Sequence, residues 1–476
     1  MPLIESDLLR NAVQQRLWAL RPFLEHYRRE LTDPAWQQFI QATSILVDLV
    51  ESFHRDSVDR ATRTHTSDPA SKERDIGLYS SVALEVLGNI HHQLLPFLHK
   101  GRLESEYLLL PTIQRKVGEH DPSAQVVLLP DFEFNYGYLG LKDYVLGKIK
   151  KLQPYLNPTT AGDFIGRAAG LCRWNVFLVY PVTESQSALN LCVVAHELAH
   201  FFDQHEELYK QCLPQKLDET SFKALIEKLC SMTVTGQGQM TMESLFTRAT
   251  IESKAYQECI EIVENWLREV IADILAARVL GPAYFFALVE YFAHVAAENA
   301  SSSTHPAMAI RLNLVMEELG CAGYLEPEGP TKIREVLLVV KQRIDDEVKK
   351  TVHSDHAHVA YETTKGQLSL VQTKLRALTT AIAYDASKYT EEVPPAIALL
   401  LKGIAPIEKL TAAGDYRPNG VVSIVNAGWE VYKTRNPEFR ALFADRVSEF
   451  QALSNLNQLL LKAVEASEVV QRWPQG

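Results

Sequence analysis

The sequence lacks any long hydrophobic run that is free of charge. Its most apolar stretch, Val270–Ala297, is interrupted by Asp273, Arg278 and Glu290, so we expect no transmembrane helix, which needs about 18 or more apolar residues. The first residues show no basic segment followed by an apolar core, so we expect no secretory signal. The six cysteines form no C-x-x-C pair, which is typical of reduced thiols. Together these absences predict a soluble, cytoplasmic protein.

Motifs for nucleotide binding and for serine hydrolases are also missing. No G-x-x-x-x-G-K-[ST], G-x-G-x-x-G or G-x-S-x-G occurs. With 48 Lys and Arg against 59 Asp and Glu, the net charge is −11, which argues against a surface for nucleic-acid phosphates. The aromatic residues in 132–138 lie beside Asp131 and Glu133, so packing is favoured over base stacking. We expect no nucleic-acid partner.

Helical periodicity dominates what is present. Asp33-Pro34 predicts a capped helix start, and apolar residues then recur three and four positions apart as far as Phe53. The polar residues 55–76 predict a solvated loop before a further helix over 78–99. Two aliphatic runs, 125–129 and 176–180, predict short strands.

The central and C-terminal parts return to helix. Thr183-Glu184-Ser185-Gln186 is a capping box that predicts the start of a long helix. The polar region 211–245 separates this helix from one over 251–280 that ends at Gly281-Pro282. Residues 351–366 and 414–420 predict breaks between later helices. We therefore expect a mainly α protein with a small β-sheet (α+β). Its three predicted regions are a helical 1–120, a mixed 121–325 and a helical 326–476.

The segment Val194–His200 carries an H-E-x-x-H motif. On a helix, His196 and His200 project from one face because they are four residues apart, and two imidazoles so placed suit a tetrahedral zinc ion. Glu197 lies where it can take a proton from metal-bound water. A third histidine ligand in the pattern H-E-x-x-H-x-x-G-x-x-H is excluded, because Asp203 and Glu206 occupy those positions.

A second helix supplies a better third ligand. Glu269 and Asp273 are again four residues apart, on an otherwise apolar stretch. One carboxylate can bind the metal while the other accepts a hydrogen bond from a ligating histidine. Burying two carboxylates without a cation would be costly, which favours a metal. The alternative is an exposed charged face that pairs with Arg268 or Arg278.

A third element, Thr304-His305-Pro306, precedes a predicted helix that contains Arg311. A cationic side chain near zinc can stabilise the oxyanion of a tetrahedral intermediate. The plainer alternative is a capped turn. A separate H-x-x-H-x-H cluster at residues 353–358 could bind a transition metal, but its polar surroundings favour a solvated loop.

The ordered motifs H-E-x-x-H, E-x-x-A-D and T-H-P-x-x-x-x-R resemble those of the M48-type gluzincin zinc metallopeptidases, in a variant without a membrane span. The resemblance covers residues 176–320 and implies a zincin-like metallopeptidase core, with one Zn²⁺ per chain, between helical regions. It implies these roles: zinc ligands His196, His200 and Glu269, general base Glu197, supporting carboxylate Asp273, and transition-state residues His305 and Arg311.

The resemblance implies hydrolysis of peptide bonds in a protein or peptide substrate. The predicted strand of Val176, Phe177, Leu178, Val179 and Tyr180 could bind substrate backbone as an edge strand, or it could be an ordinary core strand. A second functional class stays open, in which a catalytically silent, zinc-stabilised core serves regulation or interaction. The helical flanks would then be surfaces for a protein partner.

Overall fold

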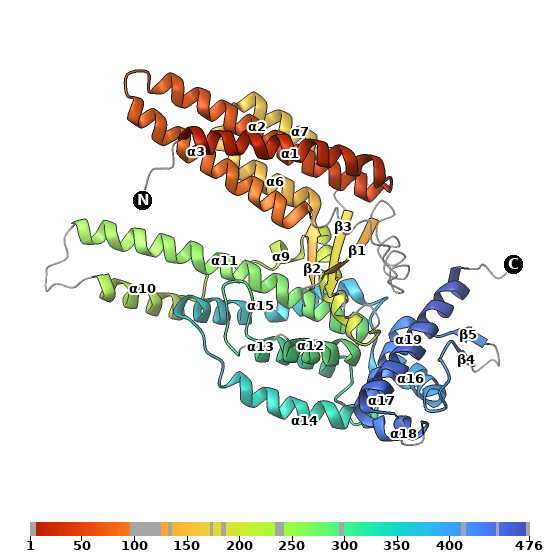
Figure 1. Ribbon diagram of the computed structural model, residues 1–476. Helices are drawn as coiled ribbons and strands as arrows, with labels where there is room; N and C mark the ends of the chain where they lie inside the picture. The colour runs from red at the N-terminus through yellow and green to blue at the C-terminus, as the bar shows by residue number, and fades with distance from the viewer. Residues whose placement is uncertain are drawn as a thin grey trace. The chain divides into compact units, whose positions relative to one another are not determined.

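The computed structural model describes residues 6–95, 125–131, 136–171, 175–181, 187–233, 242–294, 299–410, 416–443 and 447–472. The chain divides into two compact units, Met1–Val182 and Thr183–Gly476. The described residues are mostly helical with a small sheet, which confirms the predicted fold class at this level (Figure 1). Among these residues no helix is long and apolar enough to cross a membrane.

The first unit is a group of helices that pack side by side with a small sheet. Its helices are α1 (Ser6–Glu30), α2 (Pro34–Thr64), α3 (Pro69–Asn89), the π-turn η1 (Ile90–Leu94), α6 (Leu141–Leu152), the 3₁₀ turn η2 (Gln153–Tyr155) and α7 (Pro158–Ala169). The predicted N-cap is confirmed, because the Asp33 carboxylate accepts a hydrogen bond from the Ala35 N–H at 2.8 Å. The loop predicted over 55–76 is wrong, since α2 continues to Thr64 and α3 begins at Pro69.

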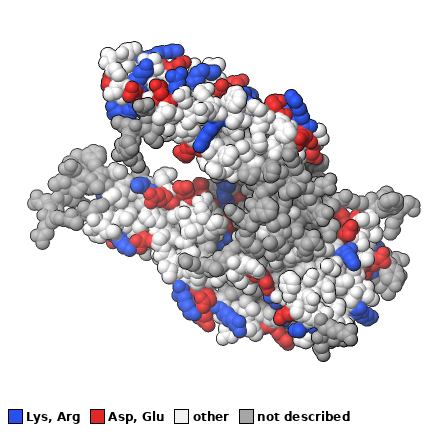
Figure 2. Space-filling model, in the orientation of Figure 1, with Lys and Arg blue, Asp and Glu red and all other residues white. Residues whose placement is uncertain are grey.

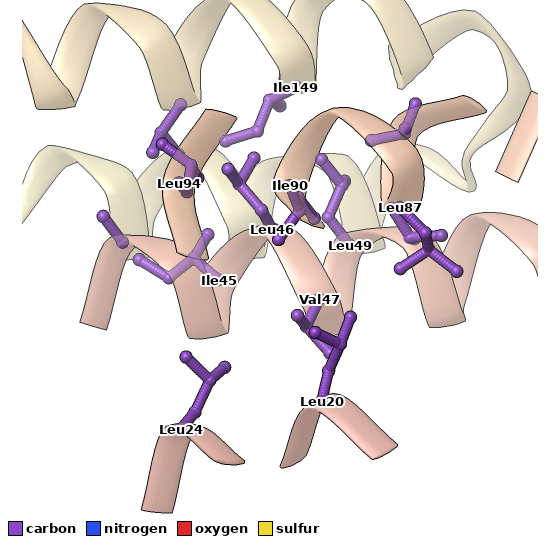
Figure 3. Packing of buried hydrophobic residues seen from close by; sticks show 14 of the residues in the cluster. Leu20, Leu24, Ile45, Leu46, Val47, Leu49, Leu87, Ile90, Leu94 and Ile149 are labelled. Carbon is purple, nitrogen blue, oxygen red and sulfur yellow. The ribbon is translucent and has the colours of Figure 1, made fainter. Parts of the chain in front are cut away.

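The core of the first unit lies between α1, α2, α3 and α6. Aliphatic side chains from these helices and from η1 interlock in it, among them Leu20, Leu24, Leu46, Leu49, Leu87, Ile90 and Ile149 (Figure 3). Each fully buried side chain of this size contributes about 1.5–3 kcal/mol. Figure 2 shows basic and acidic side chains mixed over the outer face of these helices.

The sheet contains β1 (Gln125–Asp131), β2 (Gly137–Gly140) and β3 (Asn175–Pro181) in the order β1-β3-β2. The predicted strands are confirmed, but the edge-strand role of Val176–Tyr180 is wrong. β3 is the central strand, paired in parallel with β1 and antiparallel with β2, so neither of its edges is free for a substrate backbone. Phe177 is buried against Phe39 of α2, with ring centroids 4.9 Å apart. β3 is therefore an ordinary core strand.

The second unit is built around the 39-residue helix α11 (Met242–Leu280). Before it come η4 (Asn190–Val193), α8 (Val194–Glu206), α9 (Leu208–Gln211) and α10 (Glu219–Thr233). After it come α12 (Pro282–His294), α13 (Met308–Cys321), α14 (Thr331–Val348), α15 (Asp355–Thr379), α16 (Ala386–Leu400), β4 (Glu408–Leu410), β5 (Tyr416–Pro418), α17 (Val421–Thr434), α18 (Asn436–Ala441) and α19 (Glu449–Arg472). The predicted capping box at 183–186 lies outside the described residues. The helix expected to start there, α8, begins only at Val194.

The end of α11 follows the predicted Gly-Pro signal. Gly281 has a positive φ of 61° and its N–H donates to the Ala277 carbonyl at 2.7 Å, which terminates the helix. Pro282 then opens α12. The amide of Asn426 on α17 braces this corner, accepting from the Ala283 N–H at 3.0 Å and donating to the Leu280 carbonyl at 2.8 Å.

The C-terminal helices also hold the chain just before α8. The Leu189 carbonyl accepts a hydrogen bond from Trp429 Nε1 at 3.2 Å, and the Leu189 N–H donates to Asn457 of α19 at 3.3 Å. Gly428 allows this close approach, because a Cβ there would lie 2.4 Å from Leu460. The boundary between the two units therefore differs from the boundaries of the three regions predicted from the sequence. The sheet belongs with the N-terminal helices, and residues beyond 326 belong to the same unit as the H-E-x-x-H helix.

Candidate metal centre

α8 presents the two histidines of the H-E-x-x-H motif from one face. Their ring centroids lie 4.7 Å apart with an interplanar angle of 85°. The Nε2 atoms of His196 and His200 face each other at 3.1 Å. This arrangement follows from the four-residue spacing on a helix, as the sequence predicts.

α11 brings Glu269 against both imidazoles. Glu269 Oε2 lies 3.4 Å from His196 Nε2, and Glu269 Oε1 lies 3.4 Å from His200 Nε2. Glu269 Oε2 is buried, and although it lies 3.2 Å from Arg311 Nη1, none of its contacts with described residues has the geometry of a hydrogen bond. His196, His200 and Glu269 thus form a group that could hold a metal ion. It is the only such group among the described residues.

Asp273 contacts Nδ1 of His196, the ring nitrogen that does not face Glu269 and His200. Its Oδ1 lies 2.9 Å from Nδ1 of His196, and its side chain is completely buried. When Asp273 accepts the Nδ1 proton, the Nε2 lone pair of His196 is directed to the metal position. Tyr284 of α12 donates its hydroxyl to the same Asp273 oxygen at 2.6 Å and lies 3.3 Å from His196 Nδ1.

Arg311 of α13 binds both carboxylates. Its Nε and Nη2 donate to the two oxygens of Asp273 at 2.8 and 2.9 Å, and its Nη1 lies 3.2 Å from Glu269 Oε2. The guanidinium also lies over the Phe292 ring at 5.3 Å. Its charge is therefore directed at the carboxylates. Arg311 therefore braces the centre, and the transition-state role that the resemblance implies stays a prediction.

The charges of this buried group balance one another. Burial would raise the pKa of Glu269, but the charge of Arg311 and the contacts with both histidines hold it well below its usual range. Burial would likewise lower the pKa of His196, but Asp273 and Glu269 together raise it to about 10. The carboxylates thus stay ionised and hold a proton on His196 that a metal ion would replace.

His305 lies on the loop before α13 and faces the centre from its open side. Its Nε2 is 3.7 Å from Glu269 Oε1, while its side chain is 55% exposed. Burial and the positive charges of Arg311, His196 and His200 outweigh the effect of Glu269 and lower the pKa of His305. The ring is consequently neutral near pH 7.

Glu197 is half-buried on α8 beside the two histidines. Burial, and next the negative charge of Glu197, raise the pKa of Tyr291 on α12. Glu197 and Tyr291 are therefore within electrostatic range of each other. The structure thus gathers six of the seven residues that the motifs predict, His196, His200, Glu269, Asp273, His305 and Arg311, and Glu197 follows His196 directly on α8. The strand Val176–Tyr180 belongs to the first unit.

Sequence reasoning missed the two tyrosines of α12. Tyr284 contacts Asp273 and His196. Burial and the negative charge of Glu197 raise the pKa of Tyr291. The only available signal was that Tyr284 is the one hydroxyl in the apolar run Pro282–Leu288, since a buried tyrosine hydroxyl needs a partner.

The predicted solvated loop at residues 353–358 is partly wrong. His356 and His358 lie in the first turns of α15. His353 stacks on Tyr361 with ring centroids 4.9 Å apart, and His356 pairs with Glu258 at 3.2 Å. These histidines do not converge on a metal position.

Searches against protein-family models, curated proteins and solved structures find no match to this chain.

Proposed function

We propose that the protein is a zinc-dependent peptidase of the gluzincin type, with a zincin-like core in its second unit. One observation carries the proposal. Four ligands arranged tetrahedrally around zinc at about 2.1 Å lie about 3.4 Å from one another. The Nε2 atoms of His196 and His200 lie 3.1 Å apart, and each lies 3.4 Å from a different oxygen of the Glu269 carboxylate. One ligand atom from each of the three residues lies within 4.8 Å of the other two, and these separations are of the size that a tetrahedral zinc site requires.

The donor set supports zinc over other metals. Two imidazole nitrogens and one carboxylate form a set typical of catalytic zinc sites, which leave the fourth position open. Calcium and magnesium prefer oxygen ligands in larger numbers. The position of His196 is fixed by Asp273, as such sites require.

The chain supplies a base beside this position. A bound zinc ion contributes Lewis acidity, which lowers the pKa of water and polarises a carbonyl oxygen. Glu197 accepts a proton from the attacking water and passes it to the leaving amine nitrogen as the peptide C–N bond breaks. The water oxygen forms the new bond to the carbonyl carbon, so the products are a carboxylic acid and an amine.

His305 supplies a donor on the open side. A neutral imidazole with a proton on Nε2 can donate to the oxygen that gains negative charge in the transition state. Its distance of 3.7 Å from Glu269 Oε1 places it next to the ligand set. Arg311 binds both Asp273 and Glu269, and Tyr284 binds Asp273, so both side chains hold the centre in place.

The experiment compares the wild type with Glu197→Gln. Both proteins are incubated with a cell extract, new peptide termini are read by mass spectrometry, and zinc content per chain is measured. We expect equal zinc in both and new termini only with the wild type. Glu261→Gln, on an exposed position of α11, is the matched control. New termini at equal rates in the Glu197→Gln variant would refute the proposal. Zinc without cleavage by either protein would favour the silent, regulatory class.

A further inference from the structure

The loop that carries His305 is anchored to the helix that carries Glu269. Trp266 Nε1 donates to the Ser302 carbonyl at 3.0 Å, and Asn265 Nδ2 donates to the Ser303 carbonyl at 3.2 Å. Both donors lie on α11, within about one turn of Glu269. These two hydrogen bonds therefore tie the loop of His305 to the helix that carries Glu269.

A hydrogen-bond network within the loop fixes the ring of His305. The Ser302 hydroxyl oxygen accepts from the backbone N–H of Thr304 at 3.2 Å and from that of His305 at 2.9 Å. Thr304 Oγ1 lies 3.2 Å from Ser302 Oγ and 2.8 Å from His305 Nδ1. The direction of this last bond decides which ring nitrogen carries the proton.

Counting donors and acceptors favours one direction. A hydroxyl oxygen has two lone pairs and one proton. Two backbone N–H groups occupy both lone pairs of Ser302 Oγ, and its own proton can go to the His305 carbonyl at 3.3 Å, so this atom does not accept from Thr304. Among the described residues, Nδ1 of His305 is then the acceptor within hydrogen-bond distance of the Thr304 hydroxyl.

The surroundings of Nε2, on the other side of the His305 ring, favour the same position for the ring proton. His305 Nε2 faces the ionised Glu269 carboxylate at 3.7 Å. An N–H is attracted to that oxygen, whereas a lone pair would be repelled by it.

We infer that Thr304 is a positioning residue, whose hydroxyl donates to Nδ1 of His305 and fixes the tautomer with the proton on Nε2. The ring then offers an N–H donor on the side of the ligand set. The use of this donor on a substrate carbonyl oxygen rests on the proposed function, whereas the tautomer itself does not.

The test uses the full-length protein supplied with Zn²⁺ and labelled with ¹⁵N in its histidine rings. The His305 signals are identified as those that a His305→Gln variant lacks. We expect a pyrrole-type Nε2 and a pyridine-type Nδ1 in the wild type. Thr304→Ser should keep this pattern because it keeps the hydroxyl, and Thr304→Val should give a mixture of tautomers.

Hydrolysis of a peptide substrate gives the second reading. Thr304→Val should lower kcat by about tenfold, as loss of a supporting hydrogen bond does, with KM changed less than twofold, and Thr304→Ser should restore kcat.

A proton on Nδ1 of His305 in the wild type, or an unchanged ¹⁵N pattern in Thr304→Val, overturns the inference. If no substrate is cleaved, the proposed function fails while the spectra still decide the role of Thr304. If the Thr304→Val protein does not fold, the spectra of the wild type and of Thr304→Ser decide whether the proton lies on Nε2.

Discussion

Nδ1 of His196 lies 2.9 Å from Oδ1 of Asp273, a carboxylate one helical turn beyond the ligand Glu269. Asp273 also receives three hydrogen bonds, two from Arg311 and one from Tyr284. The position of the His196 ring in the candidate metal centre therefore depends on α11, α12 and α13 together.

The first prediction tests this dependence. Asp273→Asn should weaken Zn²⁺ binding by about 10–100-fold, because the amide lacks the negative charge that makes His196 more basic and that holds Arg311 in place. Competition with a chromophoric chelator measures the Kd. Glu261→Gln on the same helix should leave the Kd unchanged. An unaltered Kd in Asp273→Asn would show that His196 needs no support.

The second prediction concerns proton release. The pKa of His196 in the metal-free protein is raised to about 10, so near pH 7 the ring carries a proton that zinc must displace. We expect about one proton from His196 per zinc bound at pH 7–8, and an affinity that rises about tenfold per pH unit there. Calorimetry in buffers with different ionisation enthalpies measures the release. Binding without proton release would contradict the charged state of His196.

The third prediction concerns a buried carboxylate at the far end of α8. Asp203 accepts the Tyr209 N–H at 2.8 Å, and burial raises its pKa to about 6. Because the folded state holds this proton more tightly than the unfolded chain, Asp203 lowers stability as the pH rises from about 4 to about 6, by up to about 3 kcal/mol. Asp203→Asn should thus stabilise the protein by about 1 kcal/mol more at pH 7.5 than at pH 5. Urea unfolding measures both values, and an equal effect at the two pH values would be inconsistent with the raised pKa.

The fourth prediction uses the backbone at the end of α8. Glu207 has a left-handed φ of 52°, and among the described residues it is the only non-glycine with a positive φ. Because a side chain in this region costs about 1 kcal/mol, Glu207→Gly should stabilise the protein by about 0.5–1 kcal/mol. Glu206→Gly, in the last helical residue of α8, should destabilise it by a similar amount. Thermal unfolding of both variants checks the opposite signs.

The fifth prediction concerns the corner between α11 and α12. Asn426→Ala leaves the Leu280 carbonyl and the Ala283 N–H without their side-chain partner. The expected loss is about 2–3 kcal/mol of unfolding free energy. Asn436→Ala, which removes only an exposed contact with Glu449, should change it by less than about 0.5 kcal/mol. Equal losses in the two variants would argue against the brace.

The sequence predicted features that depend on near neighbours. The Asp33 cap, the strand at 176–180 and the Gly281 terminus each follow from a few adjacent residues, and the structure confirms them. The pairing of His196 with His200 likewise needs only helix geometry.

What the sequence did not predict depends on distant partners or on exposure. Residues 55–64 and α10 are helices with polar, exposed faces, which resemble loops when hydrophobic spacing is the guide. The central place of β3 depends on pairing with two other strands. Arg311 was recognised from its motif, but its use as a brace depends on carboxylates some forty residues earlier in the chain.

The bonds from Trp429 and Asn457 to Leu189, and from Asn426 to the α11–α12 corner, tie both ligand-bearing helices to the last quarter of the chain. A ribosome must therefore finish almost the whole polypeptide before these bonds can form. During synthesis His196, His200 and Glu269 emerge long before the segments that align their helices, so the native geometry of the candidate centre becomes a late event, and chains that stop early would lack these bonds.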